Sequence, residues 1–169
     1  APTDFWIVTD QHTKESLATH GIAQNQIIDI GLPVDPHFAD IEPIDAENPI
    51  DPLQILYFPT PKKPHVRRVS RELLDATGPN SKLTIVLGKH LRKIHSRAKE
   101  IEDQYPGRVT IKGWTKKVPE LLNSHHLVVG KAGGATVHEA MAAECPMLIH
   151  HLVPGQEEGN LTLLRLLNG

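Results

Sequence analysis

The sequence predicts an α/β protein built on a Rossmann-like, doubly wound parallel sheet. Two observations lead to this prediction. Apolar, strand-like runs recur at residues 54–58, 82–87, 108–112, 126–129 and 146–150, and helical patterns lie between them. Strict alternation of buried-type strands with helices is typical of parallel strands covered by helices. With 169 residues, of which 39% are hydrophobic, the chain is long enough for one complete domain and a little more.

Residues 1–52 predict a smaller unit followed by a linker. Residues 4–9 are a short run of β-formers, and residues 13–21 predict a helix capped by Thr13 and ended by Gly21. Residues 26–34 then predict a strand that runs into a Gly-Leu-Pro turn, which completes one β-α-β unit. Residues 35–52 are rich in proline and acidic residues without periodicity, as expected of a linker or peripheral loop.

The remaining helices follow from apolar residues that share one face. Two helices are expected on this ground, and their apolar positions are Val66, Val69, Leu73 and Leu74 for the first, and Leu91, Ile94, Ala98 and Ile101 for the second. The runs "KKVPELLNS" and "TVHEAMAAE" predict two shorter helices. In sheets of this class ligands bind outside the carboxyl ends of the strands, where the strand order reverses. The loops after residues 58, 87, 112, 129 and 150 are therefore the candidates for a site.

The loop "GKAGGAT" is the first candidate. Gly133 and Gly134 let the backbone turn tightly and approach a ligand, and the N–H groups at the following helix start favour an anion such as a diphosphate. Alternatively, the two glycines only make a strand-to-helix turn. The usual nucleotide motifs, the P-loop and G-x-G-x-x-G after a strand, do not occur in the sequence.

Glu139 has two interpretations. The run Thr136-Val-His-Glu139 matches a capping box, in which Thr136 caps the helix start and Glu139 reaches back to the Thr136 N–H. Alternatively, its carboxylate accepts hydrogen bonds from both hydroxyls of a ribose.

The nearby loop "PGQEEGN" combines carboxylates and amides, a mixture that suits sugar hydroxyls. Alternatively, this loop is a solvated helix start in which Pro154 and Gly155 make a turn.

Composition excludes several classes of function. A net charge of −2 argues against general nucleic-acid binding, and the basic cluster of Lys62, Lys63, Arg67 and Arg68 is more typical of a solvated loop and first helical turn. The lone Cys145 predicts a small buried residue in a reducing compartment. No run is long enough to cross a membrane.

Histidines occur in two pairs, His125-His126 and His150-His151. Neighbours in a strand face opposite sides of the sheet, so neither pair predicts a metal site, and the chain lacks the Cys/His spacing of a zinc site. We expect no metal and no cofactor.

Taken together, "GW" at 113–114, "GKAGGATVHEA" and "VPGQEEGN" resemble the C-terminal half of a GT-B glycosyltransferase. The resemblance is strongest to the group of monogalactosyldiacylglycerol synthases and diacylglycerol glucosyltransferases. The opening residues support it, since Gly31, Pro33, Val34 and Phe38 match that group's Gly-x-Pro-Val-x-x-x-Phe pattern. By this resemblance, residues 1–52 are the end of an N-terminal domain with the interdomain linker, and residues 53–169 are a UDP-sugar donor-binding domain truncated at its C-terminus.

The resemblance implies roles for matching residues. The diphosphate of a UDP-sugar would lie on Gly133, Gly134, Ala135 and Thr136, and Glu139 would bind the ribose diol. The donor sugar would contact Gln156, Glu157 and Asn160, and the backbone at Gly113 and Trp114 would border the uracil. The catalytic base is expected on the N-terminal domain.

Two loops depart from this group's pattern. The first strand of the donor domain leads into "PTPKKPHVRR" where the group has a glycine-rich loop that meets the donor phosphates, and the second leads into "GKHLRK". Lys62, Lys63 or Lys89 would then have to supply charge in place of backbone amides.

The function implied is hexosyl transfer from a UDP-sugar to a lipid acceptor such as diacylglycerol, with this chain supplying the nucleotide site and inactive by itself. The alternatives are a UDP-sugar epimerase of the same fold and a degenerate, non-catalytic binding domain. The expected location is cytoplasmic, with peripheral membrane association of the full-length enzyme through its acceptor-binding domain.

Overall fold

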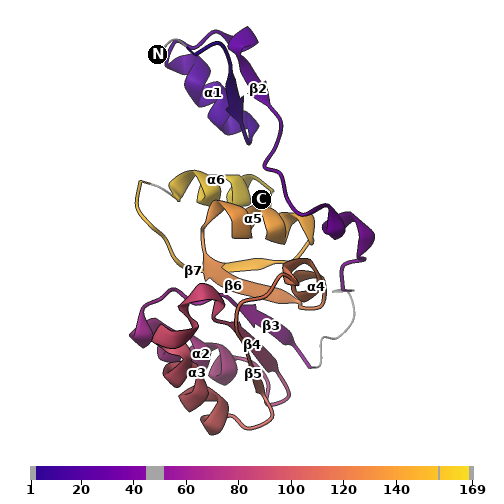
Figure 1. Ribbon diagram of the computed structural model, residues 1–169, viewed down its shortest axis with the longest axis vertical. Helices are drawn as coiled ribbons and strands as arrows, with labels where there is room; N and C mark the ends of the chain where they lie inside the picture. The colour runs from indigo at the N-terminus through magenta and orange to yellow at the C-terminus, as the bar shows by residue number, and fades with distance from the viewer. Residues whose placement is uncertain (1–2, 45–51, 156, 168–169) are drawn as a thin grey trace.

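The computed structural model describes residues 3–44, 52–155 and 157–167. Within these residues the strands form one two-stranded sheet and one five-stranded sheet, and every strand pair is parallel (Figure 1). The five-stranded sheet has the order β5-β4-β3-β6-β7. This order confirms the predicted Rossmann-like α/β class, because the chain winds outward from β3 in one direction and then returns to continue outward from β6 in the other.

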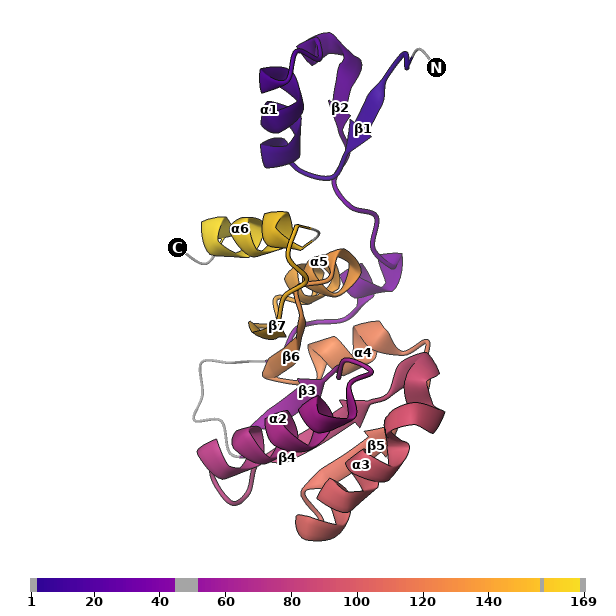
Figure 2. The same ribbon diagram turned by 90° about the vertical axis from the view of Figure 1, so that its left-hand side faces the viewer.

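The N-terminal unit consists of β1 (Trp6–Val8), α1 (Gln11–Thr19) and β2 (Ile27–Asp29). The predicted β-α-β unit is therefore confirmed, but the predicted cap is wrong. Asp10 caps α1, and its carboxylate accepts hydrogen bonds from the N–H and the hydroxyl of Thr13. Asp10 is the better cap because its side chain reaches the N–H of the third helical residue from outside the helix. Figure 2 shows this unit standing apart from the main sheet at one end of the molecule.

The segment after β2 is less peripheral than its composition predicts. A short 3-10 helix (Pro36–Asp40) places Phe38 in a core cluster with Leu122 and Val128. Only 6% of Phe38 is exposed, so this part of the predicted linker is anchored to the main domain. Residues 45–51 of that linker lie outside the described residues.

The main sheet contains β3 (Gln54–Tyr57), β4 (Lys82–Val86), β5 (Val109–Lys112), β6 (Leu127–Lys131) and β7 (Met147–His151). The helices after these strands are α2 (Lys63–Ala76), α3 (Leu91–Gln104), α4 (Val118–Asn123), α5 (Gly134–Ala142) and α6 (Glu158–Leu167). All five predicted strands are present, with ends that differ from the prediction by one or two residues.

Helices cover both faces of this sheet. On one face, α2 and α3 pack Val66, Leu73, Ile94 and Ile101 against alternate strand residues. On the other face, α4 and α5 pack with the 3-10 helix that carries Phe38. The central strand β3 is consequently buried on both sides, which explains its continuous apolar run. None of the helices in the described part of the chain combines the length and apolar character needed to cross a bilayer.

Candidate functional site

The order of the strands places one edge of the sheet in position to bind a ligand. The order reverses between β3 and β6, and ligands of doubly wound sheets bind at the carboxyl ends of the two strands that flank such a reversal. The loop after β3 contains Pro59, Thr60 and Pro61, and the loop after β6 contains Ala132 and Gly133. These two loops therefore define the candidate site.

The loop after β6 leads directly into α5. This helix begins at Gly134, its N-cap is Gly133, and no side chain caps it. The first intrahelical bond runs from the Val137 N–H to the Gly133 carbonyl. The N–H groups of the three residues before Val137 thus have no intrahelical acceptor, which makes this helix start suited to an anion.

The capping box expected at Thr136 and Glu139 does not form. Because α5 begins at Gly134, Thr136 already lies inside its first turn and Glu139 lies in the second. The first turn contains no acidic residue. The structural explanation for Glu139 is therefore wrong, because a strand-to-helix turn made of two glycines starts the helix earlier than the Thr136 cap would.

The Glu139 side chain has no hydrogen bond or ion pair among the described residues. Burial raises the pKa of its carboxyl group, and the nearby carboxylate of Asp35 raises it further. A half-buried carboxylate beside another acid is unfavourable for folding. Glu139 consequently offers acceptor oxygens that the protein itself does not use.

The turn at Gly133 is packed closely by neighbouring side chains. A Cβ atom on Gly133 would lie 3.2 Å from Lys131 Nζ, and one on Gly134 would lie 3.7 Å from Asn160 Nδ2. The lysine Nζ in turn donates a short hydrogen bond to Glu157 Oε1. The absence of a side chain at Gly133 therefore allows Lys131 to fold back across the turn.

Glu157 and Asn160 support this turn. The Glu157 side chain is only 4% exposed, and its second oxygen accepts a hydrogen bond of 3.0 Å from the Val153 N–H. Burial alone would raise the pKa of Glu157, but the Lys131 ammonium and the Val153 N–H outweigh it and hold the pKa below its ordinary value. Asn160 Nδ2 donates a 2.9 Å hydrogen bond to the Ala132 carbonyl.

The structure thus brings Glu157 and Asn160 to the glycine turn, in keeping with the sequence prediction that both loops share one edge. In this arrangement, however, both Glu157 oxygens and the Asn160 amide nitrogen already have protein partners. Gln156, the third residue expected to contact a sugar, lies outside the described residues.

Gly113 and Trp114 lie in the loop after β5, at the edge of the sheet. Two strands separate β5 from β6, so this loop is about 14 Å from the glycine turn at a strand spacing of about 4.8 Å. Trp114 is 59% exposed, and Lys116 Nζ lies 6.0 Å from the centre of its ring. Only an extended ligand would contact both Trp114 and the turn.

Comparison with known proteins identifies the fold. No family model matches the chain. It is 25% identical to a processive diacylglycerol β-glucosyltransferase of Bacillus mycoides, over 93% of this chain and 42% of that protein. Anabaena HepE in complex with UDP and glucose superposes with a TM-score of 0.50 at 17% identity, over 96% of this chain and 53% of that one. The chain has a GT-B-like fold.

This GT-B-like domain spans less than half the length of the curated relative, and about half of the HepE chain. The UDP-GlcNAc 2-epimerase of Neisseria meningitidis bound to UDP-GlcNAc also superposes, with a TM-score of 0.58, 15% identity and coverage of 98% of this chain and 53% of that one. Likeness at this identity establishes the fold alone.

One part of the GT-B domain was not predicted from the sequence. The rings of His150 and His151 lie with their centres 6.4 Å apart, and both approach His65 of α2, at 6.2 Å and 5.5 Å. The expectation that this pair faces opposite sides is wrong. The register between β6 and β7 shifts by one residue, from Gly130 opposite Ile149 to Lys131 opposite His151, so that His150 is the extra residue of a bulge.

The other histidine pair has a structural role. His125 is buried between Thr84 Oγ1, at 2.9 Å from its Nε2, and the Leu121 carbonyl, at 2.6 Å from its Nδ1. Burial lowers its pKa. His126 Nδ1 accepts the Gln54 N–H at 2.9 Å. Both histidines therefore connect strands and helices within the GT-B domain.

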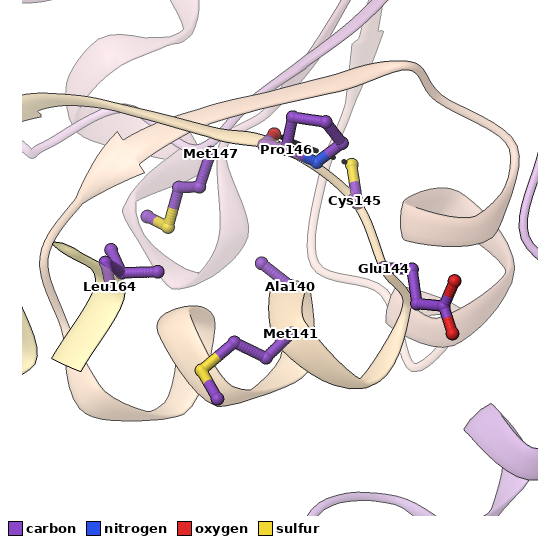
Figure 3. Close-up of a pocket in the computed structure, with 7 residues that line it drawn as sticks. All are labelled: Ala140, Met141, Glu144, Cys145, Pro146, Met147 and Leu164. Carbon is purple, nitrogen blue, oxygen red and sulfur yellow. Dashed lines mark hydrogen bonds between the residues drawn. The ribbon is translucent and has the colours of Figure 1, made fainter. Parts of the chain in front are cut away.

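A pocket of about 520 Å³ lies at the start of β7, away from the carboxyl ends of the strands. Figure 3 shows the residues that line it. It opens between the C-terminal half of α5, the start of β7 and α6, and Met141, Met147 and Leu164 line it. Cys145 lies in its wall, where burial raises the pKa of the thiol to about 11. Cys145 is thus a buried thiol, as the sequence predicts, and the pocket is at the opposite end of β7 from the histidines.

Proposed function

We propose that this chain is the donor-binding part of an enzyme that transfers a hexose from a UDP-sugar to a lipid acceptor such as diacylglycerol. The observation that carries this proposal is the arrangement of α5. Its start presents three N–H groups without an intrahelical acceptor, and Glu139 follows on the next turn with an unused carboxylate. The N–H groups at the start of α5 are hydrogen-bond donors suited to a diphosphate, and the Glu139 carboxylate is an acceptor suited to the ribose diol.

The lipid acceptor is inferred from the relative. The similarity to the Bacillus mycoides diacylglycerol β-glucosyltransferase extends over 93% of this chain, and therefore includes both candidate loops. The base that activates the acceptor hydroxyl is expected outside this chain, so the chain alone is expected to bind the donor without transferring the sugar. Transfer requires both substrates to be held around one bond, and that orientation is lost when one half is missing.

A chimera tests this proposal against the epimerase of the same fold. In it, this chain replaces the matching 42% of the Bacillus mycoides enzyme. Incubated with UDP-glucose and diacylglycerol, the folded chimera is expected to form glucosyl-diacylglycerol, and with UDP-glucose or UDP-GlcNAc alone it is expected to form no epimer. An epimer formed without acceptor, from the chimera or from this chain, would contradict the proposal, as would a folded chimera that binds UDP-glucose and transfers nothing.

A further inference from the structure

The carboxyl edge at the switch point carries a cluster of three imidazoles, His65, His150 and His151, which the glycine turn does not explain. His65 belongs to the first turn of α2, and the other two end β7. Their ring centres are 5.5 to 6.4 Å apart, and the His150 ring also meets the Tyr57 ring edge-on at 5.4 Å. His65 follows β3, and His150 and His151 end β7. Because β3 and β7 are the two strands on either side of β6, the cluster lies beside the loop that starts α5.

The nitrogens of this cluster are only partly used by the protein. His65 Nδ1 lies 3.2 Å from Thr60 Oγ1, and its Nε2 has no partner among the described residues. Both ring nitrogens of His150 are shielded from solvent and lack a hydrogen-bond partner in the described part of the chain, as does the Tyr57 hydroxyl. Buried polar atoms in proteins are nearly always paired, so unpaired ones indicate a missing partner.

The surroundings of the cluster are mostly basic. Lys62 and Arg68 approach from the α2 side and influence His65. Lys131 faces His151 across the strand pair, and its charge is matched by Glu157, an acid that lies near this edge. Tyr57, a further titratable neighbour, is uncharged at neutral pH, and burial raises the pKa of its phenol further. A cluster with this balance favours an anionic ligand.

The loop after β3 gives a reason for such a cluster. Pro59 and Pro61 have no N–H to donate, so this loop cannot surround a phosphate with backbone amides. Single amides such as that of Thr60 remain, so most donors on this side of the switch point must come from side chains. His65 and Lys62 follow this loop immediately, and the bulge in β7 turns His150 toward them.

We propose that His65, His150 and His151, with Lys62, bind the diphosphate of the nucleotide-sugar donor from the side opposite the α5 helix start. This inference rests on the proposed function and specifies which residues take the place of a glycine loop. His65 and His151 contribute N–H donors, whereas His150, whose ring nitrogens are shielded from solvent, contributes through its charge. Each of the three imidazoles becomes a cation when it takes up a proton.

Protonation of these imidazoles links donor binding to pH. Burial, followed by the neighbouring positive groups, lowers the pKa of His65, and burial with His65 and His151 lowers that of His150 to about 4. Without ligand both rings are therefore neutral at neutral pH. A bound dianion favours the protonated forms, so binding takes up protons and affinity rises as pH falls.

Calorimetry of the whole 169-residue chain with three probes tests this inference. The probes are UDP-glucose, whose phosphates keep a fixed charge in this range, uridine, which has none, and inorganic pyrophosphate. Binding is measured near pH 6 and near pH 8, with EDTA present to remove metals. UDP-glucose is expected to bind about tenfold more tightly at pH 6 than at pH 8. This ratio corresponds to the uptake of about half a proton for each bound ligand over two pH units. Uridine binding is expected to be independent of pH.

The variants are His65→Gln, His65→Lys and the control His95→Gln, which changes an exposed histidine on α3. His65→Gln is expected to weaken UDP-glucose binding about tenfold, in line with loss of one charged hydrogen bond, and to leave uridine binding unchanged. His65→Lys is expected to restore affinity near pH 8 and to flatten the pH dependence. A purely structural role for His65 would not produce this rescue. The control is expected to match the wild type.

The outcomes separate the two proposals. UDP-glucose binding that is unaffected by pH and by His65→Gln would overturn the histidine inference and leave the donor site on α5 intact. Histidine-dependent binding of pyrophosphate without binding of UDP-glucose or uridine would support an anion site and contradict the nucleotide-sugar function. No binding of any probe by the folded wild type would overturn both.

Discussion

Glu139 is a half-buried carboxylate that the protein itself leaves without a partner. Burial and Asp35 raise its pKa, so the folded state binds its proton more tightly than the unfolded chain does. By linkage, Glu139 lowers the stability of the folded state as pH rises above the ordinary value of 4.5. A residue that costs stability at neutral pH is most readily explained by ligand binding.

Replacement of Glu139 by glutamine distinguishes the ribose role from a structural one. At neutral pH the Glu139→Gln variant is expected to have an unchanged or higher melting temperature, because an unfavourable charge is removed. UDP affinity is expected to fall about 10- to 100-fold, as for loss of hydrogen bonds to a charged group worth about 1.5–3 kcal/mol. Glu144→Gln, an exposed change just after the same helix, is the control. A lower melting temperature with unchanged UDP affinity would contradict the ribose role.

The ion pair between Lys131 and Glu157 connects the glycine turn to the loop before α6. Replacing Lys131 by methionine leaves the buried carboxylate without its cation, and a loss of about 1–3 kcal/mol in unfolding free energy is expected. A double-mutant cycle with Glu157→Gln measures the interaction energy between the two side chains. Because the pKa of Glu157 is lowered, its stabilisation is present above pH 4.5 and is lost as pH falls below that value. Additive effects of the two changes at neutral pH would show that the pair contributes no coupling.

For individual residues, the sequence predicts which side chains lie near the glycine turn better than it predicts their hydrogen-bond partners. Glu157 and Asn160 were expected at the same edge as the glycine turn, and they lie there. Their hydrogen bonds to Lys131 and Ala132 join residues 26 and 28 positions apart. Such partners depend on how the loop before α6 folds back, and no local pattern indicates it.

Among the elements, β7 differs most from its prediction. The run "PMLIH" correctly predicts a strand, but the side on which each residue lies depends on its register with β6. The one-residue shift at Gly130 reverses the side of every residue beyond it. The histidine cluster was therefore not predictable from a period of two.

Burial of His150 at the bulge is expected to make the stability of the folded state depend on pH. Because the pKa of His150 falls to about 4 from its ordinary 6.5, the unfolded chain binds its proton more tightly, and the native state loses stability as pH falls from about 6.5 toward 4. In the His150→Phe variant, which keeps the ring against Tyr57, this contribution is expected to disappear. Denaturant unfolding at several pH values should then show that acidification lowers the unfolding free energy of His150→Phe less than that of the wild type. The control His95→Gln should lose as much unfolding free energy as the wild type. An equal loss of unfolding free energy on acidification in the wild type and in His150→Phe would contradict the burial of a neutral His150.

The helix starts show the limit of local capping rules. Thr13 and Thr136 were both predicted near helix starts, and both lie inside the first turn. In each case the chain offers an earlier cap, Asp10 or Gly133. Periodicity identifies the helix bodies well, since the predicted apolar faces of α2 and α3 are buried, apart from Leu91, whose side chain lies outside the described part of the structure. The exact start of a helix is harder to predict, because several small polar residues or glycines near its beginning can each act as the cap.

At the scale of the whole molecule, the strand order matters most for function. Reversal between β3 and β6 brings the loop after Tyr57, the glycine turn and the end of β7 to one edge. The α/β class and the site edge were both predictable, because strict strand-helix alternation leaves few topologies. The N-terminal unit keeps Phe5, Ile7 and Ile30 exposed and lies apart from this edge, so the proposed donor site does not depend on it.

Calorimetric titration of UDP into this chain tests the central claim most directly. We expect saturable binding at one site per chain, accompanied by a rise in melting temperature that increases with UDP concentration as mass action requires. UDP-glucose should compete for the same site, because both ligands carry the uridine and diphosphate that α5 is proposed to hold. A folded chain that shows neither heat nor a change in melting temperature at millimolar UDP would contradict the assignment of a donor-binding domain.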